Sequence, residues 1–376
     1  MKIVVAIDSF KGSISSLQAG NSVALGIRRV KPDADIKIYP IADGGEGTVS
    51  ALVSGMGGQL KKVKVKNPLY EDIIAEYGIL GKTAIIEMAA SSGIALLKKE
   101  RLNPMLATTY GVGQMIKDAI ESGCDNFVIG IGGSATNDGG VGMLMALGYE
   151  FLDANGKSIS FGAKGLADIV TIKDDKVIPK LKDCSFSIAC DVKNPLCGEM
   201  GCSAVFSPQK GARHNEISVM DKALSHYAEI TKQKYQNADM NYPGAGAAGG
   251  LGFAFLSYLN ASLNPGIDLI LREINIEKDI IDADLVITGE GRIDSQTIMG
   301  KAPIGIAKLS KKYNKPVIAF SGCVTRDANV CNGNGIDAIF PIVRSACSLE
   351  DAMNEENAMN NMADCVEQAI RLFVLK

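Results

Sequence analysis

Short apolar runs recur near both ends of the chain, and each one stops at a polar or glycine-rich turn. They cover Lys2–Ile7 and residues 36–41, 285–288, 317–320 and 336–343. Segments with apolar residues at helical spacing occur between or after these runs, at residues 15–30, 48–54, 303–312 and 349–375. Ser15 or Ser16 is the expected N-cap of the first helix. Alternating strands and helices are typical of a parallel sheet covered by helices, so the two chain ends predict one doubly wound unit.

The pattern differs in the middle of the chain, where period-two alternation appears. Residues 63–66 alternate, and runs at 73–80 and 83–87 flank a turn at Gly81-Lys82, which predicts antiparallel strands. Residues 149–153 and 157–160 flank Ala154-Asn155-Gly156, a β-hairpin signal. Further strands are predicted at residues 126–129 and 185–190, and helices at residues 106–122, 141–147 and 215–231.

These patterns predict an α/β protein with two dissimilar domains. One is discontinuous and doubly wound, with a parallel sheet built from residues 1–65 and 270–376. The other, residues 66–269, is inserted into it and has a mixed sheet. The length of 376 residues agrees with two domains.

A glycine-rich stretch from Gly130 to Gly142 lies between a predicted strand and a predicted helix. The bare backbone N–H groups of such a loop, together with the helix N-terminus, favour a phosphate ligand. Ser134, Thr136 and Asn137 add polar donors, and the Asp138 carboxylate suits a divalent cation. Phosphate together with a metal ion indicates a nucleotide. The alternative interpretation is a glycine turn that only lets the helix pack closely on the strand.

Composition and charge exclude several classes of protein. The net charge is −3, no Lys/Arg block stands out, aromatic residues make up 6% and tryptophan is absent, so nucleic-acid binding is not expected. The nine cysteines form no Cys-x-x-Cys pair, which predicts reduced thiols in a cytoplasmic protein. The first apolar run is too short for a signal peptide.

Residues 241–267 carry no charge, but glycines and prolines interrupt them, so no membrane-spanning helix is expected. We interpret this segment as a buried glycine loop followed by a core helix. Its glycines, from Gly244 to Gly252, serve either a second phosphate site or close packing.

Carboxylates and cations follow five of the predicted strands. They are Asp8 with Lys11, Asp43 with Glu46, Asp138 in the glycine loop, Asp191 with Lys193, and Glu290 with Arg292 and Asp294. In open α/β sheets ligands bind outside the carboxyl ends of the strands, so these groups are candidates for one site. Phosphoryl transfer needs cations and N–H groups on the phosphates, carboxylates on Mg²⁺, and a carboxylate that orients the acceptor hydroxyl. Each carboxylate taken singly also has an ordinary role as a helix cap or turn residue.

Two well-known nucleotide motifs were compared with the chain. Around Gly300-Lys301 the positions that a P-loop requires hold Ser295 and Ala302, so this is not a P-loop. Gly130, Gly132 and Ala135 followed by Glu150 fit the count of a dinucleotide-binding loop, which leaves an NAD(P)-dependent oxidoreductase as an alternative.

Taken together, the motifs resemble those of the type 1 glycerate kinases, bacterial enzymes that phosphorylate D-glycerate with ATP. The matching stretches cover residues 6–12, 40–48, 130–142, 189–196 and 288–294, in the family's order along essentially the whole chain. The resemblance implies two dissimilar α/β domains, one of them discontinuous and flavodoxin-like, with the active site between them. It also implies ATP with Mg²⁺ as cofactor and a phosphoglycerate product, with 2-phosphoglycerate favoured over 3-phosphoglycerate.

On this basis we assign hypothetical roles to the candidate residues. The ATP phosphates are held by the glycine loop through Gly132, Gly133, Ser134, Thr136, Asn137 and Asp138. Lys11 and Arg292 neutralise the transferred phosphoryl group or clamp the glycerate carboxylate. The Mg²⁺ ligands are expected among Asp43, Asp191 and Glu290. One of Asp8, Asp191 and Asp294 orients the acceptor hydroxyl.

Two alternatives to the kinase stay open at this point. The oxidoreductase predicts NAD(P)H binding, and a two-lobed small-molecule binding protein predicts tight glycerate binding without ATP turnover. The sequence leaves open whether the protein is a monomer or a homo-oligomer.

Overall fold

The computed structural model describes residues 1–42, 47, 49, 52–53 and 57–375, which form two compact units. The first unit contains the two ends of the chain, up to residue 42 and from Ile267 onward, and the second contains the segment from Gly58 to Gly266. Asp43 and Glu46, both predicted to be functional, lie outside the described residues, as does part of the helix predicted at 48–54.

The first unit is built on a five-stranded parallel sheet with the order β13-β12-β11-β1-β2. The strands are β1 (Lys2–Ile7), β2 (Asp35–Pro40), β11 (Leu285–Ile293), β12 (Val317–Val324) and β13 (Ala338–Pro341). Counted along the chain this is the 2-1-3-4-5 order of flavodoxin-like folds, which confirms the predicted doubly wound sheet. The strand order reverses between β1 and β11, and ligands bind at such a switch point.

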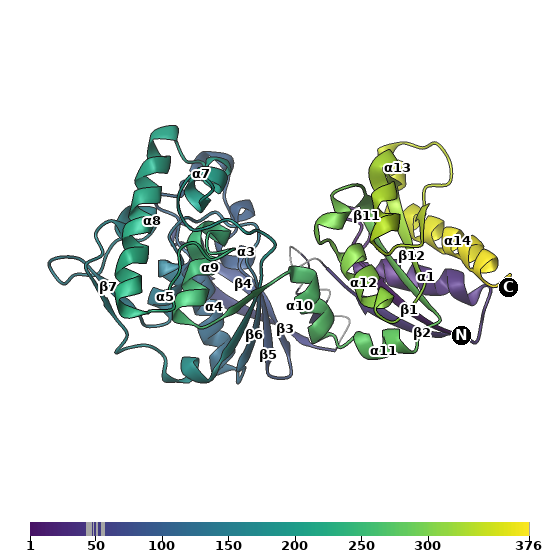
Figure 1. Cartoon of the computed structure of the whole chain (residues 1–376), viewed down its shortest axis with the longest axis horizontal. Helices are drawn as coiled ribbons and strands as arrows, with labels where there is room; N and C mark the ends of the chain where they lie inside the picture. Colours follow the sequence, from purple (N-terminus) through teal and green to yellow (C-terminus); the bar gives the residue numbers. More distant parts are fainter. Residues whose placement is uncertain (43–46, 48, 50–51, 54–56, 376) are drawn as a thin grey trace. The chain divides into compact units, whose positions relative to one another are not determined.

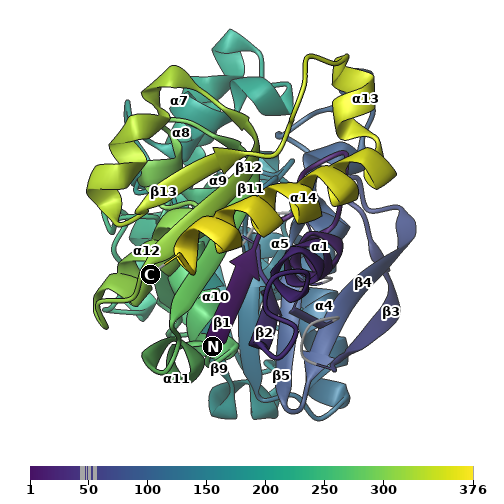
Figure 2. The same ribbon diagram turned by 90° about the vertical axis from the view of Figure 1, so that its right-hand side faces the viewer.

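Helices cover both faces of this sheet. They are α1 (Ser16–Arg28), α10 (Gly266–Glu273), α11 (Glu277–Ile281), α12 (Ala302–Lys311), α13 (Leu349–Met353) and α14 (Glu355–Phe373). Ser15 caps α1, as predicted, in a capping box with Gln18. The helices α1 and α14 lie side by side, and Figure 2 shows α14 in front of the strands. Gly26 permits this contact, because a Cβ there would lie 2.4 Å from the Ala363 carbonyl oxygen.

Three sequence predictions in this unit were wrong in their boundaries. The single closing helix predicted at 349–375 is two helices, because Asn354 is extended and caps α14 by accepting from the Asn357 N–H. The strands β11 and β12 continue past the predicted ends at residues 288 and 320, since they keep pairing with each other beyond the end of β1. Gly289 is therefore not a loop residue; a Cβ there would lie 2.1 Å from the Phe320 carbonyl oxygen of β12.

The second unit contains a six-stranded mixed sheet with the order β10-β9-β6-β5-β4-β3. The strands are β3 (Gln59–Lys66), β4 (Asp72–Leu80), β5 (Thr83–Glu87), β6 (Asn126–Gly130), β9 (Ser185–Ala189) and β10 (Ser262–Asn264). The pairs among β3, β4 and β5 are antiparallel, and those among β5, β6, β9 and β10 are parallel. The prediction of a mixed sheet is confirmed.

The helices of this unit surround one large apolar core. They are α3 (Ala89–Ser92), α4 (Tyr110–Glu121), α5 (Val141–Ala146), α6 (Ala163–Leu166), α7 (Cys202–Phe206), α8 (His214–Lys234) and α9 (Ala247–Tyr258), and Figure 1 labels most of them. Residues 248–250 have left-handed backbone angles, so a regular helix begins only after them. This agrees with the predicted glycine loop and core helix. None of the described helices is long and apolar enough to cross a membrane.

The hairpin predicted at 149–160 forms only in its turn. The Asp153 carboxylate accepts the N–H groups of Asn155 and Lys157, at 2.8 and 2.9 Å, which stabilises that turn. However, β7 (Glu150–Leu152) pairs with the distant β8 (Thr171–Lys173), and only one bridge, between Leu152 and Ser158, joins the two sides of the turn. A local turn signal does not specify which strand supplies the ladder.

Candidate active site

The glycine loop lies at the carboxyl edge of the parallel strands in the second unit. Glu87, Gly130, Ala189 and Asn264 are neighbours in register across β5, β6, β9 and β10. The loop after Gly130 therefore begins between Glu87 and the segment that leads to Asp191. This is the edge where open α/β sheets bind ligands. Glu87 was missed by the sequence analysis because it reads as the last residue of an ordinary strand.

Gly132 and Gly133 form the exposed part of the loop. No atom lies within 4 Å of a Cβ built on Gly132, and Gly133 has a φ of +73°, which favours glycine. The two sides of this arch are fixed, since the Ile94 N–H donates to the Gly133 carbonyl at 2.8 Å and the Ala135 N–H donates to the Ser92 carbonyl at 3.0 Å. An anion can therefore approach the backbone of this arch without meeting a side chain of the loop glycines.

Asp138 lies inside the loop and not on its open side. It is 1% exposed, and its carboxylate accepts the N–H groups of Thr109, Gly140 and Gly142 at 2.8, 3.2 and 3.2 Å. The hydroxyls of Thr109 and Thr108 donate to it as well, at 2.9 and 3.3 Å. These donors occupy the carboxylate, so it supports the start of α5 and is a poor metal ligand. Both donor groups of Thr109 bind Asp138, and α4 begins at the next residue, Tyr110, and not at the predicted residue 106.

Thr136 and Asn137 are also fully buried. The Asn137 amide donates to the Ser203 hydroxyl of α7 at 2.9 Å. The hydroxyl oxygen of Ser134 and the carbonyl oxygen of Thr136 both accept hydrogen bonds from the ammonium of Lys210, at 2.6 and 2.7 Å. Lys210 ends a short 3₁₀ helix, Pro208–Lys210, and is 2% exposed. No sequence signal identified it, because it is separated from the loop by more than seventy residues.

The second glycine-rich segment serves close packing against the first. The Gly139 N–H donates to the Gly249 carbonyl at 2.9 Å, and a Cβ on Gly249 would lie 2.1 Å from the Thr136 carbonyl oxygen. A Cβ on Gly246 would lie 2.2 Å from the Pro195 carbonyl oxygen. The question left open by the sequence is therefore answered, since these glycines bring three loops into backbone contact.

Asp191 is exposed and follows β9 on the same edge as the glycine loop. Its carboxylate accepts the Gly266 N–H at 3.0 Å. The next residues pack beside it, because the Asn194 carbonyl accepts the N–H groups of Gly244 and Gly246. Asp191 is thus an exposed residue on a fixed segment.

In the first unit, a pocket of about 360 Å³ opens at the carboxyl edge of the sheet. Its charged lining residues are Asp8, Lys11, Glu290, Arg292 and Lys301. Asp8 and Glu290 are buried, whereas the Lys11 and Arg292 side chains are exposed. The pocket therefore combines buried carboxylates with long, exposed cationic side chains at the switch point between β1 and β11. Its volume leaves room for a small organic acid.

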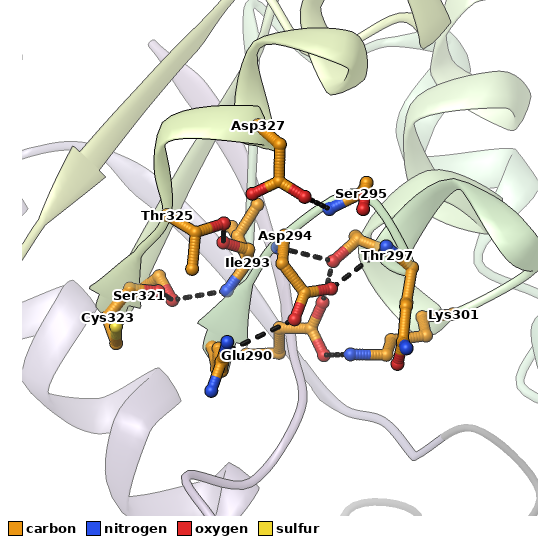
Figure 3. A network of polar contacts seen from close by, with 12 residues as sticks. Glu290, Ile293, Asp294, Ser295, Thr297, Lys301, Ser321, Cys323, Thr325 and Asp327 are labelled. Carbon is orange, nitrogen blue, oxygen red and sulfur yellow. Dashed lines mark hydrogen bonds and ion pairs between the residues drawn. The ribbon is translucent and has the colours of Figure 1, made fainter.

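Glu290 is held on both oxygens (Figure 3). One accepts the Thr297 hydroxyl at 2.7 Å, and the other lies 3.1 Å from the Lys301 ammonium. Burial raises the pKa of the Glu290 carboxyl above its ordinary value, although Thr297 and Lys301 act in the opposite direction. A buried carboxyl with a raised pKa suits proton transfer, because its pKa lies nearer to the working pH than that of an exposed carboxyl.

Asp294 lies beside the pocket and is not one of its lining residues among the described part of the chain. Its carboxylate accepts the Gln296 N–H at 2.9 Å and pairs with the Arg292 guanidinium at 3.1 Å. We therefore reassign it from the acceptor hydroxyl to Arg292, which it orients. Asp8 does line the pocket, and one of its oxygens accepts the Ser9 N–H at 2.6 Å.

The structure thus groups the predicted residues by unit. Asp8, Lys11, Glu290 and Arg292 share the pocket of the first unit. The loop residues Gly132 to Asp138 share the carboxyl edge of the second unit with Asp191. Lys301, which the sequence analysis mentioned only in rejecting a P-loop, joins the first group through Glu290.

The described residues contain no cluster of three His, Cys, Asp or Glu side chains suited to a metal ion. Mg²⁺ does not require one, because it commonly binds one or two carboxylates together with substrate phosphates and waters. Asp191, which is exposed beside the glycine loop, fits this arrangement. The Mg²⁺ role predicted for Glu290 stays a prediction.

The dinucleotide alternative requires a carboxylate at a strand end near the loop. Glu150 instead lies at the start of β7, in a separate two-stranded ribbon, and pairs with Lys176 at 2.8 Å. Glu150 therefore cannot be the ribose-binding acid that the residue count of a dinucleotide loop assigned to it.

Comparison with known proteins shows the family and the fold to which the chain is similar. The sequence profile of the glycerate kinase family matches residues 3–374. The chain is 46% identical to a glycerate kinase from Haemophilus influenzae over 100% of both chains. It is 48% identical to the glycerate 2-kinase of Escherichia coli, over 94% of this chain and 93% of that protein. A crystal structure of a protein proposed to be a glycerate kinase 2, from Salmonella typhimurium LT2, superposes with a TM-score of 0.92 at 43% identity, over 99% of this chain and 98% of that one.

Proposed function

The chain belongs to the glycerate kinase family, and from this premise we propose which of its residues carry the reaction. It is a kinase that transfers a phosphoryl group from ATP to glycerate. The observation that carries the proposal is the pocket of the first unit, where buried carboxylates stand beside exposed cations. Such a pocket suits a small hydroxy acid, which carries one negative charge and a hydroxyl to be deprotonated.

The cationic side chains of Lys11 and Arg292 bind the carboxylate of D-glycerate. Arg292 suits this role because its guanidinium forms two parallel hydrogen bonds to a carboxylate, and Asp294 orients it. Lys11 is exposed at the pocket mouth and supplies a second charge. Both interactions select an acid over an uncharged alcohol.

Glu290 is the base. Its carboxylate accepts the proton of the acceptor hydroxyl as the hydroxyl oxygen attacks the γ-phosphorus, and the bond from that phosphorus to the ADP oxygen breaks. The raised pKa of Glu290 supports this role, because a base works best when its pKa is nearer to the working pH than that of an ordinary carboxylate. Lys301 and Thr297 keep the carboxylate in place. Asp8, buried in the same pocket, orients the acceptor hydroxyl.

The glycine loop binds the ATP phosphates through the backbone of Gly132 and Gly133. The open space over Gly132 supports this assignment. Asp191, beside the loop, is the proposed protein ligand of Mg²⁺, which neutralises the charge of the phosphate oxygens when it is bound. Asp138 and Asn137 are internal supports of the loop.

The favoured product is 2-phosphoglycerate, as the name of the E. coli relative indicates for that protein. The test is to incubate the enzyme with MgATP and D-glycerate and to record ³¹P NMR spectra. Loss of the γ-phosphate signal with a new phosphomonoester signal that matches authentic 2-phosphoglycerate is the expected result. A match to 3-phosphoglycerate would reverse the choice of hydroxyl.

A further inference from the structure

Lys210 has an unusual environment for a lysine. Its side chain is 2% exposed, and its ammonium donates to two neutral acceptors, the Ser134 hydroxyl and the Thr136 carbonyl. Burying an ammonium group is unfavourable unless acceptors and a counter-charge compensate for the lost water. Lys210 has hydrogen-bond acceptors for its ammonium group. Neither of these acceptors carries a negative charge.

Both acceptors belong to the glycine loop. The ammonium donates to the Ser134 hydroxyl at 2.6 Å and to the Thr136 carbonyl at 2.7 Å, so it holds the loop from its buried side. The neighbouring segment adds a neutral contact, from the Asn137 amide to the Ser203 hydroxyl. The positive charge therefore lies at Ser134 and Thr136, the part of the loop that directly follows the exposed Gly132 and Gly133.

We propose that Lys210 is a positioning residue for the ATP phosphates, which it serves by fixing Ser134 and Thr136 and by supplying a positive charge beneath the loop. The bound phosphate then adds to the counter-charge that the nearby Asp138 carboxylate supplies. This inference rests on the proposed role of the glycine loop as the phosphate site. Lys210 does not touch the ligand itself, because the loop lies between them.

The protonation of Lys210 gives the inference a pH dependence. Burial lowers the pKa of the Lys210 ammonium to about 8, although Cys202 and the Asp138 carboxylate, the titratable groups that face it, raise it. The positive charge is present below that pKa and is lost above it. Affinity for MgATP should therefore decrease as the pH rises from 7 to 9.5, whereas an exclusively structural lysine would not couple to the ligand.

The first test compares Lys210→Met with wild type. The expected result is a dissociation constant for MgATP at pH 7 that is at least tenfold higher, a KM for glycerate within threefold of wild type, and no pH dependence of MgATP binding between pH 7 and 9.5. Lys234→Met is the matched control, since Lys234 in the same unit bonds instead to the Ile172 carbonyl and to Asp174. This control should bind MgATP like wild type. MgATP affinity within threefold of wild type in folded Lys210→Met would overturn the inference.

Wild-type protein gives a second test that needs no folded variant. Its dissociation constant for MgATP, measured calorimetrically across pH 7 to 9.5, should rise with a midpoint at or above about 8, because a bound phosphate raises the pKa of the lysine. A flat profile overturns the inference.

Gly132→Ala separates this inference from the proposed function of the loop. The added methyl group meets no atom within 4 Å in the protein, so the fold tolerates it, but it occupies the open side where phosphate must approach. Weak MgATP binding in Gly132→Ala together with normal binding in Lys210→Met would overturn only the role of Lys210. Normal binding in both variants would overturn the phosphate loop as well.

Discussion

The buried Lys210 also predicts a measurable change of stability with pH. Its pKa is about 8 in the folded protein, against 10.5 for a solvated lysine. Because the folded pKa is the lower one, the unfolded chain binds more protons between these two values, and stability must rise with pH there. Each pKa unit corresponds to about 1.4 kcal/mol, so the gain between pH 8 and 9.5 is about 2 kcal/mol.

The assay is urea unfolding of wild type and Lys210→Met at several pH values from 7 to 9.5. Tyrosine fluorescence suits it, because the chain has no tryptophan and eight of its ten tyrosines lie between residues 58 and 266. The signal therefore follows the second unit, which contains Lys210. Other groups that titrate in this range contribute to both proteins, so the difference between the two curves isolates Lys210.

The difference in unfolding free energy between wild type and variant should change by about 2 kcal/mol in favour of wild type from pH 8 to 9.5. Below pH 7.5 the two curves should run parallel. Parallel curves over the whole range would refute the reasoning, since they would mean that Lys210 titrates at the same pH in the folded and unfolded states.

The remaining predictions concern the proposed site. Glu290→Gln should lower kcat by about 10²–10⁴-fold with little change in the glycerate KM, and an unchanged kcat would exclude Glu290 as the base. Since the pKa of Glu290 is raised, kcat/KM of wild type should rise with pH along an acid limb whose midpoint lies above 4.5. Thr297→Val, which removes the hydroxyl donor to this carboxylate, should move the limb to higher pH, and an unmoved limb would assign it to another group. Arg292→Ala should raise the glycerate KM about tenfold, because the variant loses the guanidinium that binds the glycerate carboxylate. Arg29→Ala is the control, since it removes a surface partner of Asp364 and should leave this KM unchanged. Equal effects of the two substitutions would count against carboxylate binding by Arg292. Asp138→Ala should lower the free energy of unfolding by about 3–6 kcal/mol in urea titrations, because three backbone N–H groups lose their acceptor, and a loss under 1 kcal/mol would contradict that account.

Local sequence patterns predicted the positions of single helices and strands better than they predicted which strands pair with each other. The strand Lys2–Ile7 and the Ser15 cap follow from residues within a few positions of each other, and both were predicted. The hairpin near Asp153 failed because its turn is local, whereas the true partner of β7 is supplied by residues 171–173. Pairing at a distance depends on packing that no short window contains.

The candidate site divides in the same way. Gly132 and Glu290 were predicted because glycines and acids after apolar runs are visible in the sequence. Glu290 nevertheless lies within β11 and not in a loop, because β12 continues to pair with it. Lys210 could not be predicted, since one lysine in a polar stretch has no pattern of its own. Only the fold brings it beneath Ser134.

The discontinuity of the first unit has a consequence for synthesis on the ribosome. The strand β1 is made before its neighbour β11, which begins at Leu285, more than 240 residues after β2 ends at Pro40. At translation rates of about 5–20 residues per second, this delay is about 10–50 s. The second unit, which is continuous from Gly58 to Gly266, emerges in full during that interval. During that interval β1 lacks β11 and α1 lacks α14, so the apolar surfaces that these later segments cover in the finished unit stay exposed.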